Sequence, residues 1–318
     1  MKNTLMAFLV LSFVLSATAI SAQEIATTGS IAGTVVDQNG AAIPGAKITV
    51  SGPTVDRAAV VNDQGRFEIT GLLPGNYKLT GEQSGFKKTI VSDVVVFVGK
   101  AANVQVKLEP GEVTAEVNVT SVDNIDQATT AISSNLNDQL YKNVPVARGV
   151  SSLFTLAPGT TTGVGGVNDR DNPSISGGTA LDNLYVADGV NITNTAFGGI
   201  GTFSRSYGSL GTGIILSLVK EVQVKTAGFE PQYGQSEGGI VNIITRSGSN
   251  EFHGAIYGYG QPHQFEATRR QQDDFAVNKL GDLVHQEHYD FGADLGGYVP
   301  GLRDKLFFFG YYEGFRNR

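Results

Sequence analysis

The feature that most restricts the fold is a series of short β-type segments separated by glycine-rich turns, at residues 219–259. Residues 219–225 (VKEVQVK) form the first segment. Residues 230–246 add a glycine-punctuated turn and a second segment, and residues 247–259 add a polar turn and a third. Valine, isoleucine and threonine favour extended backbone, whereas glycine, asparagine and serine favour turns. The pattern predicts strand, turn, strand, turn and strand.

Glycine is unusually frequent in the chain, and cysteine is absent from it. The 318 residues include 41 glycines, against the ~7% of an average protein, and they do not follow collagen spacing. They indicate many turns and close backbone contacts. A chain without cysteine forms no disulfide, thiolate metal site or cysteine nucleophile. The net charge of −7, without any run of basic residues, argues against a nucleic-acid partner.

The N-terminus has the pattern of a secretory signal peptide. Lys2 supplies a positive charge, residues 5–15 are almost continuously apolar, and small residues allow cleavage after Ala19 or Ala22. The apolar run is shorter than the ~20 residues of a spanning helix, so we expect a cleaved signal at residues 1–22 rather than an anchor. No later segment is an apolar helix of that length, so a membrane-embedded form would have to be a β-barrel.

Residues 28–109 predict a small β-sandwich with a core of its own. Short alternating segments recur about every ten residues between turn signals such as Asp37-Gln-Asn-Gly40. The expected strands are residues 31–36, 46–50, 67–70, 77–80, 87–91, 94–98 and 102–108. The unit resembles the carboxypeptidase regulatory-like domain, a transthyretin-like sandwich, in Gly33-Thr-Val-Val-Asp37, Ile43-Pro-Gly-Ala46, Gly65-Arg-Phe67 and Leu73-Pro-Gly-Asn-Tyr77. That resemblance implies an accessory domain without catalytic residues.

Residues 110–127 read as a linker, and residues 128–247 predict an α+β unit. Short helical turns are expected near residues 138–141 and 150–156, the second ending at Pro158-Gly159. Asp188-Gly189 is a favoured tight-turn pair between extended segments, so we assign it a structural role as a turn.

From residue 248 the pattern changes to long alternating strands. Residues 288–295 place apolar and polar side chains on opposite faces, with Tyr289, Phe291, Ala293 and Leu295 on one and His288, Asp290, Gly292 and Asp294 on the other. A strand between lipid and an aqueous lumen needs this arrangement. The next expected strand is aromatic and covers residues 305–315. The connection over residues 261–287 is long and the one over residues 300–304 is short, as in barrels that the chain enters from the periplasm.

Residues 219–259 and 306–315 resemble the junction between plug and barrel in TonB-dependent outer-membrane receptors. The N-terminal sandwich narrows this resemblance to the Oar-like type. A SusC-like receptor usually has a longer alanine- and serine-rich tract at the position of residues 226–232. This sequence lacks that tract, which argues against the SusC-like type. The implied fold is mainly β: a transthyretin-like sandwich, an α+β plug and the first strands of a transmembrane barrel. Such barrels have roughly 22 strands and this chain offers about three, so we expect a truncated sequence.

The resemblance implies TonB-dependent uptake of a substrate across the outer membrane of a Gram-negative bacterium, with the N-terminal domain in the periplasm. The implied partners are the C-terminal domain of TonB, outer-membrane lipid and an extracellular substrate, which the sequence leaves open among siderophore, carbohydrate, peptide and protein. No cofactor or metal is implied. The alternative is a non-transporting adhesion or secretion-related protein that is built from the same domains.

Two segments carry the site residues that this resemblance implies. The first resembles the TonB box, which binds TonB by adding a strand to its sheet, and comprises Glu116, Val117, Asn118, Val119 and Thr120. The alternative is an ordinary β-prone stretch, since valine and threonine favour extended backbone wherever they occur. The second is the glycine-rich loop at residues 198–213. Its Phe203, Arg205 and Tyr207 are the expected substrate contacts; the alternative is a flexible loop that lets the plug move.

Two chemical motifs compete with this interpretation, and neither has the required context. Gly234-Gln-Ser236-Glu-Gly238 has the spacing of a nucleophile elbow, but that turn must lead into a helix, whereas a β-branched segment follows here. His285 and His288 are three residues apart, whereas the zinc motif HExxH places its histidines four apart on a helix. We therefore expect no enzyme activity.

Overall fold

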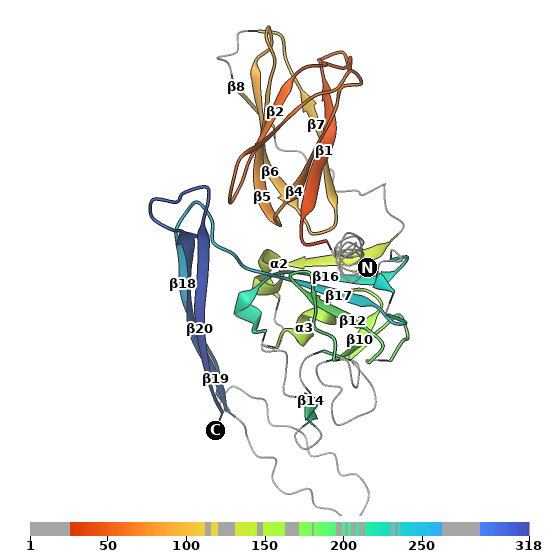
Figure 1. Ribbon diagram of the computed structural model, residues 1–318, viewed down its shortest axis with the longest axis vertical. Helices are drawn as coiled ribbons and strands as arrows, with labels where there is room; N and C mark the ends of the chain where they lie inside the picture. The colour runs from red at the N-terminus through yellow and green to blue at the C-terminus, as the bar shows by residue number, and fades with distance from the viewer. Residues whose placement is uncertain are drawn as a thin grey trace, which may run out of the picture.

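The protein consists of three units that follow one another along the chain (Figure 1). They are a β-sandwich, a central unit with a mixed sheet and short helices (residues 131–246), and a three-stranded antiparallel sheet. The computed structural model describes residues 26–111, 116–119, 131–144, 149–162, 172–179, 181–194, 199–200, 203–204, 208–209, 214–229, 233–234, 236–262 and 287–317. The expected signal peptide, residues 1–22, lies outside the described residues.

The sandwich is built from two sheets with strand orders β4-β1-β7 and β3-β2-β5-β6-β8. Its pairs are antiparallel except β1 with β7 and β6 with β8, which are parallel. The strands are β1 (Gly29–Val36), β2 (Lys47–Ser51), β3 (Arg57–Val60), β4 (Arg66–Leu72), β5 (Gly75–Glu82), β6 (Lys88–Val96), β7 (Ala101–Lys107) and β8 (Glu116–Val119).

Alternation and turn chemistry explain why this segment folds as a sandwich. Every second residue along β4 and β5 is buried, and these side chains form one core with those of β1, β2, β6 and β7. The expected turn at Asp37 forms because the Asp37 carboxylate accepts hydrogen bonds from the backbone N–H groups of Asn39 and Ala41 at 2.8 Å. Gly40 follows with φ of 85°, a conformation that glycine adopts without strain.

The strand predictions were wrong at two places in the sandwich. Strand β3 was not expected. The two strands expected at residues 87–91 and 94–98 are one continuous strand, β6, in which a β-bulge falls at Ser92-Asp93. Asp93 has φ of 60°, so the polar pair that reads as a turn in the sequence only kinks the strand.

The central unit is built on a five-stranded sheet with order β13-β12-β17-β16-β9. Two small two-stranded sheets, β10-β11 and β14-β15, accompany it. Its elements are β9 (Ile132–Asn137), α2 (Asp138–Asn143), α3 (Ser151–Phe154), β10 (Thr160–Thr162), β11 (Pro173–Ile175), β12 (Leu184–Ala187), β13 (Val190–Asn191), β14 (Phe203–Ser204), β15 (Gly208–Ser209), η3 (Leu216–Leu218), β16 (Val219–Ala227) and β17 (Ile240–Thr245). Both expected helical turns are present, as α2 and α3. The core of the unit lies between the sheet and α3, where Leu153 and Phe154 pack near Tyr185 and Val222.

The last unit contains β18 (His253–Gln261), β19 (His288–Tyr298) and β20 (Phe307–Asn317), paired in sequence order. The alternation predicted for β19 is present, since Phe291 and Leu295 are 50% and 54% exposed whereas Asp290 is 5% exposed. The exposed aromatic ring of Phe291 lies directly over Gly314 of the next strand, where a Cβ atom would come within 2.6 Å of the ring. A larger residue at position 314 would require the ring of Phe291 to move.

Among the described residues, no helix has the length and apolarity needed to cross a membrane.

The sandwich core gives a direct test of the fold. Leu79 on β5 is fully buried in the core, and truncating it to alanine leaves a cavity. We expect Leu79→Ala to lower the free energy of unfolding by about 2–5 kcal/mol, as measured by urea denaturation. Val60→Ala, at an exposed position on β3, is the control and should change the unfolding free energy by less than about 0.5 kcal/mol. Equal effects of the two substitutions would contradict the assigned core.

Candidate functional site

The best-defined polar cluster joins the sandwich to the central sheet, and we call it the joint (Glu221, Gln223, Asn135 and the backbone of Val98). Glu221 is 1% exposed, and its Oε1 accepts hydrogen bonds from the Val98 N–H at 3.1 Å and from the Asn135 side-chain amide. The carbonyl of Val98 in turn accepts from Gln223 Nε2 at 2.8 Å and from Asn135 Nδ2 at 3.2 Å. One residue of the sandwich therefore serves three side chains of the central unit.

Strand β16 can form this joint because both of its faces are buried. Val222 and Val224 point into the core of the central unit, and Glu221 and Gln223 alternate with them on the opposite face. The sandwich covers that opposite face, as the stacking of the two units in Figure 1 shows. The face reads in the sequence as solvent-exposed because its residues are polar. Sequence analysis consequently missed these residues, and no local signal marks them.

Burial changes the acidity of Glu221. Removing the carboxyl from water raises its pKa from 4.5 to about 6. The hydrogen bonds from Asn135 and Val98 and the positive charges of Lys100 and Lys220 act in the opposite direction without cancelling the effect. Two further amide oxygens in the joint, Asn135 Oδ1 and Gln223 Oε1, are buried without a hydrogen-bond partner in the structure. The joint is therefore polar but incompletely satisfied.

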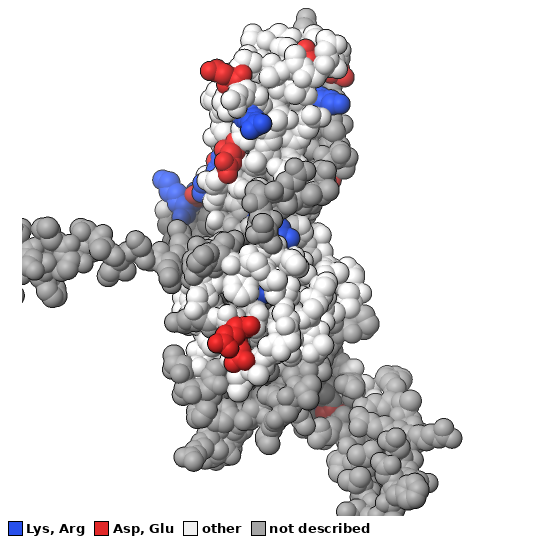
Figure 2. Space-filling model, turned by 90° about the vertical axis from the view of Figure 1, so that its right-hand side faces the viewer, with Lys and Arg blue, Asp and Glu red and all other residues white. Residues whose placement is uncertain are grey.

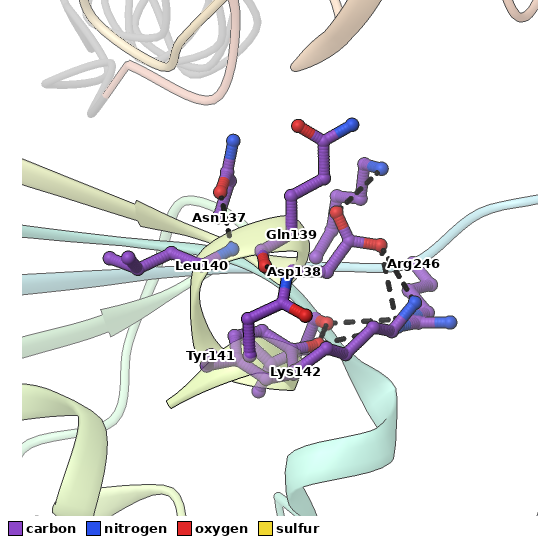
Figure 3. Close-up of polar contacts among 10 residues, drawn as sticks. Asn137, Asp138, Gln139, Leu140, Tyr141, Lys142 and Arg246 are labelled. Atoms are coloured by element: carbon purple, nitrogen blue, oxygen red, sulfur yellow. Dashed lines mark hydrogen bonds and ion pairs between the residues drawn. The ribbon is translucent and has the colours of Figure 1, made fainter. Parts of the chain in front are cut away.

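A second cluster surrounds Asp138 at the start of α2 (Figure 3). Its carboxylate lies 3.3 Å from Lys220 Nζ and 3.5 Å from both Lys142 Nζ and Arg246 Nη2. Burial favours the neutral acid, but Lys220, Lys142 and Arg246 outweigh it and hold the pKa of Asp138 below its usual value. Arg246 Nη2 also donates to the hydroxyl of Tyr141 at 3.3 Å. Asp138 thus fixes α2 against the neighbouring ends of β16 and β17.

Antiparallel pairing of β16 and β17 brings these residues together. The pairing sets Val219 opposite Thr245, so Lys220 at the start of β16 lies close to Arg246, just beyond the end of β17. Helix α2 is positioned by its cap, in which the side-chain oxygen Oδ1 of Asn137 accepts a hydrogen bond from the N–H of Leu140 at 3.0 Å. Arg246 is also the first residue of the connection into β18. The Asp138 cluster therefore stands at the junction of the central unit and the three-stranded sheet.

Two polar contacts tie the three-stranded sheet to the rest of the molecule. Glu313 on β20 accepts hydrogen bonds from the hydroxyls of Ser217 in η3, at 2.6 Å, and of Tyr257 on β18, at 2.9 Å. Asn250 donates its N–H to the carbonyl of Pro53 in the sandwich at 2.9 Å, and its Nδ2 to Asp304 Oδ1 at 2.6 Å. Each of the three units therefore contacts both of the others.

The predicted TonB box forms β8 over residues 116–119, and Thr120 lies outside the described residues. In the predicted substrate loop, Phe203 is in β14, which pairs with β15, whereas Arg205 and Tyr207 lie outside the described residues. Among the described residues, the predicted TonB box and the predicted substrate loop do not contact each other. Strand β14 lies at the end of the central unit remote from the sandwich (Figure 1).

Asp188 and Gly189 form the turn between β12 and β13, with φ of 47° and 83°. The Asp188 carboxylate accepts from Thr245 N at 2.9 Å and from Thr245 Oγ1 at 2.7 Å. These bonds hold the turn against the end of β17.

The nucleophile-elbow motif around Ser236 is not arranged for catalysis. The Ser236 hydroxyl lies within hydrogen-bond distance of the carbonyls of Gly239, at 2.7 Å, and Asp182, at 3.2 Å, and strand β17 rather than a helix follows. A hydroxyl that donates to backbone carbonyls holds a turn together. His285 lies outside the described residues. Within the described part of the chain, no group of three or more His, Cys, Asp or Glu residues could hold a metal ion.

Surface charge does not mark a docking site on the face shown in Figure 2. Acidic and basic side chains of the described residues are dispersed over that face, singly or in small groups. The charges with defined partners are instead the buried carboxylate of Glu221 in the joint and the partly buried carboxylate of Asp138.

Comparisons with known proteins agree with this order of units. Residues 30–109 match the carboxypeptidase regulatory-like domain, and residues 244–318 match an outer membrane beta barrel domain. The chain thus has the domains of an outer-membrane β-barrel protein with an N-terminal accessory sandwich. Over 299 residues, or 89% of the chain, it is 33% identical to the TonB-dependent transporter Oar of Myxococcus xanthus. It is a homologue of that transporter and spans 26% of its length.

Solved receptor structures are also similar. The siderophore receptor PirA from Acinetobacter baumannii is 21% identical, with a TM-score of 0.43, over 60% of this chain and 25% of that one. The ferric enterobactin receptor PfeA from Pseudomonas aeruginosa is 18% identical, with a TM-score of 0.41, over 58% of this chain and 24% of that one.

The raised pKa of Glu221 predicts how stability depends on pH. Because the folded state holds the proton of Glu221 more tightly than the unfolded state, the contribution of this group to stability is fully present below pH 4.5 and is lost as the pH rises through about 6. A rise of about 1.5 pKa units corresponds to about 2 kcal/mol. We expect Glu221→Gln to remove about that much of the decrease in unfolding free energy between pH 4.5 and 7.5, as measured by urea denaturation.

A matched control separates the titration of Glu221 from a general loss of negative charge. Glu68 is an exposed carboxylate on β4, and Glu68→Gln should leave the pH dependence as in the unmodified protein. If Glu221→Gln and the unmodified protein show the same dependence, Glu221 is not the buried titrating group.

Proposed function

We propose that this chain belongs to a TonB-dependent transporter that takes up a substrate across the outer membrane. The observation that carries the proposal is the 33% identity to Oar across all three units of the fold. Oar is a TonB-dependent transporter, and the chain covers about a quarter of its length. In this proposal the central unit is the plug and the three-stranded sheet is the first part of the barrel wall.

The two faces of the three-stranded sheet support this assignment. Register places Ile256, Ala293 and Tyr312 side by side on one face, and these side chains are exposed. The opposite face carries Asp294 and Glu313. An apolar face toward lipid and a polar face toward the plug is the arrangement that a barrel wall requires. Glu313 would then hold the plug to the wall through the hydroxyl of Ser217.

The contacts of the sandwich support a periplasmic position for it. Asn250 and Asp304 lie at the end of the three-stranded sheet where a short turn at residues 299–306 joins β19 to β20 and where β18 begins. Short turns face the periplasm in outer-membrane barrels. Asn250 donates to the sandwich at that end, so the sandwich, and with it the predicted TonB box, would face the energy-transducing TonB protein.

The opposite end of the plug would face outward. Strand β14, which contains Phe203, lies remote from the sandwich (Figure 1). This supports residues 198–213, with Arg205 and Tyr207, as the contact for an extracellular substrate. No covalent chemistry is needed, because energy would reach the plug as mechanical work from TonB.

The TonB box can be tested by removing its backbone donors. We expect Val117→Pro combined with Val119→Pro to lower the affinity for the purified C-terminal domain of TonB at least tenfold, since strand addition requires main-chain N–H groups. Calorimetric titration of the detergent-purified protein measures the affinity. TonB-dependent growth of a strain that carries the same variant provides the cellular readout.

The matched control keeps both N–H groups. Val117→Thr combined with Val119→Thr has similar β propensity and should bind TonB within about threefold of the unmodified protein. If the proline variant binds TonB and supports growth as well as the threonine variant, residues 116–120 are not the TonB box. Growth without any binding of TonB would instead favour a non-transporting role.

A further inference from the structure

The predicted TonB box is held by the sandwich as an edge strand. Strand β8 pairs in parallel with β6, and the register sets Lys88 opposite Glu116 and Val91 opposite Val119. It is the outermost strand of the sheet β3-β2-β5-β6-β8 (Figure 1). Strand addition is also how a TonB box would bind TonB. The same backbone segment therefore has two possible partners.

The chain leading to β8 is tethered to the same edge of the sandwich. Lys87 donates its backbone N–H to the carbonyl of Glu109 at 2.8 Å, and its ammonium group lies 3.0 Å from the Glu109 carboxylate. Gly111 donates to the carbonyl of Gly85 at 3.1 Å. Only residues 112–115 separate this tether from β8. A connection this short keeps the segment at a high effective concentration beside β6.

The described pairing of β8 lies on a buried stretch of β6. Three consecutive residues that face β8 in the register, Thr89, Ile90 and Val91, are at most 2% exposed. The β-bulge at Ser92-Asp93 follows immediately and bends the strand. The bulge also prevents the remainder of β6 from presenting a straight free edge.

We propose that the N-terminal sandwich regulates energy transduction by competing with TonB for residues 116–119. This inference rests on the proposed function, because it assumes that these residues are a TonB box. Along a strand, alternate residues direct their backbone N–H and C=O groups to opposite edges. Pairing with β6 occupies all the groups on one edge of β8 and fixes the segment against the sandwich. TonB binds after β8 has left β6, and the observed affinity is the intrinsic one reduced by the fraction of undocked protein.

A reversible covalent lock tests the competition. The chain has no cysteine, so Lys88→Cys combined with Glu116→Cys places one thiol pair across the two strands. We expect the oxidised variant to bind the TonB C-terminal domain at least tenfold more weakly than the same sample after reduction. Reduction should restore the binding, since it frees β8 without any other change. Failure of the pair to oxidise would itself contradict the docking.

A second thiol pair is the matched control. Ser51 and Lys78 face each other on β2 and β5 of the same sheet, so Ser51→Cys with Lys78→Cys locks the sandwich and leaves β8 free. Oxidation of this control should leave TonB binding unchanged. Equal binding by the oxidised and reduced β6–β8 variant would show that TonB adds to β8 in place, and the inference would fall.

Hydrogen exchange separates this failure from failure of the proposed function. In the protein without TonB, docking predicts slowed exchange of alternate amides of residues 116–119, and the Val117→Pro substitution should abolish that protection. If exchange is slow but TonB binds neither the reduced variant nor the unmodified protein, residues 116–120 are not a TonB box and the proposed function fails. If exchange is slow and TonB binds equally well with and without the disulfide, the TonB box stands and only the proposed competition is rejected.

Discussion

The burial of Glu221 and Gln223 beneath the sandwich is the constraint on which the arrangement of the three units depends. A buried carboxylate or amide needs hydrogen-bond partners, and leaving one unpaired costs about 1–3 kcal/mol. The backbone of Val98 supplies these partners only in one orientation of the sandwich. An apolar interface would tolerate sliding, whereas these directional bonds set one relative orientation. The opposite face of β16 is fixed in the core by Val222 and Val224.

This orientation has consequences for the three-stranded sheet. Strand β17 pairs with β16 and continues through Arg246 into the connection to β18, so the position of the joint fixes where that sheet begins. Asn250 then closes a loop of contacts by returning to the sandwich. A displacement of the sandwich therefore strains the joint and the Asn250 contact together. Work applied near residues 116–119 would reach the central unit through both.

The sequence predicts what local chemistry determines. Alternation and turn residues such as Gly40 locate most sandwich strands, and the period of two predicts the two faces of β19. Contacts between distant segments are not predictable in this way. Nothing in the sequence around Glu221 indicates that another domain covers it, and the pairing of residues 116–119 with β6 depends on a neighbour in space. Ser236 shows the converse, since its local motif suggests chemistry that the following strand β17 does not allow.

The joint combines precise orientation with modest strength. Its buried carboxylate has a pKa raised to about 6, so near neutral pH it is ionised in a site that disfavours the charge. Two unpartnered amide oxygens, on Asn135 and Gln223, add to the cost. If the central unit is the plug of a transporter, as proposed, it must move under force and needs contacts that define the resting state and can still be broken. Hydrogen bonds break over a short displacement, whereas an apolar interface loses its stabilisation gradually as area is exposed. A polar, incompletely satisfied joint meets both requirements.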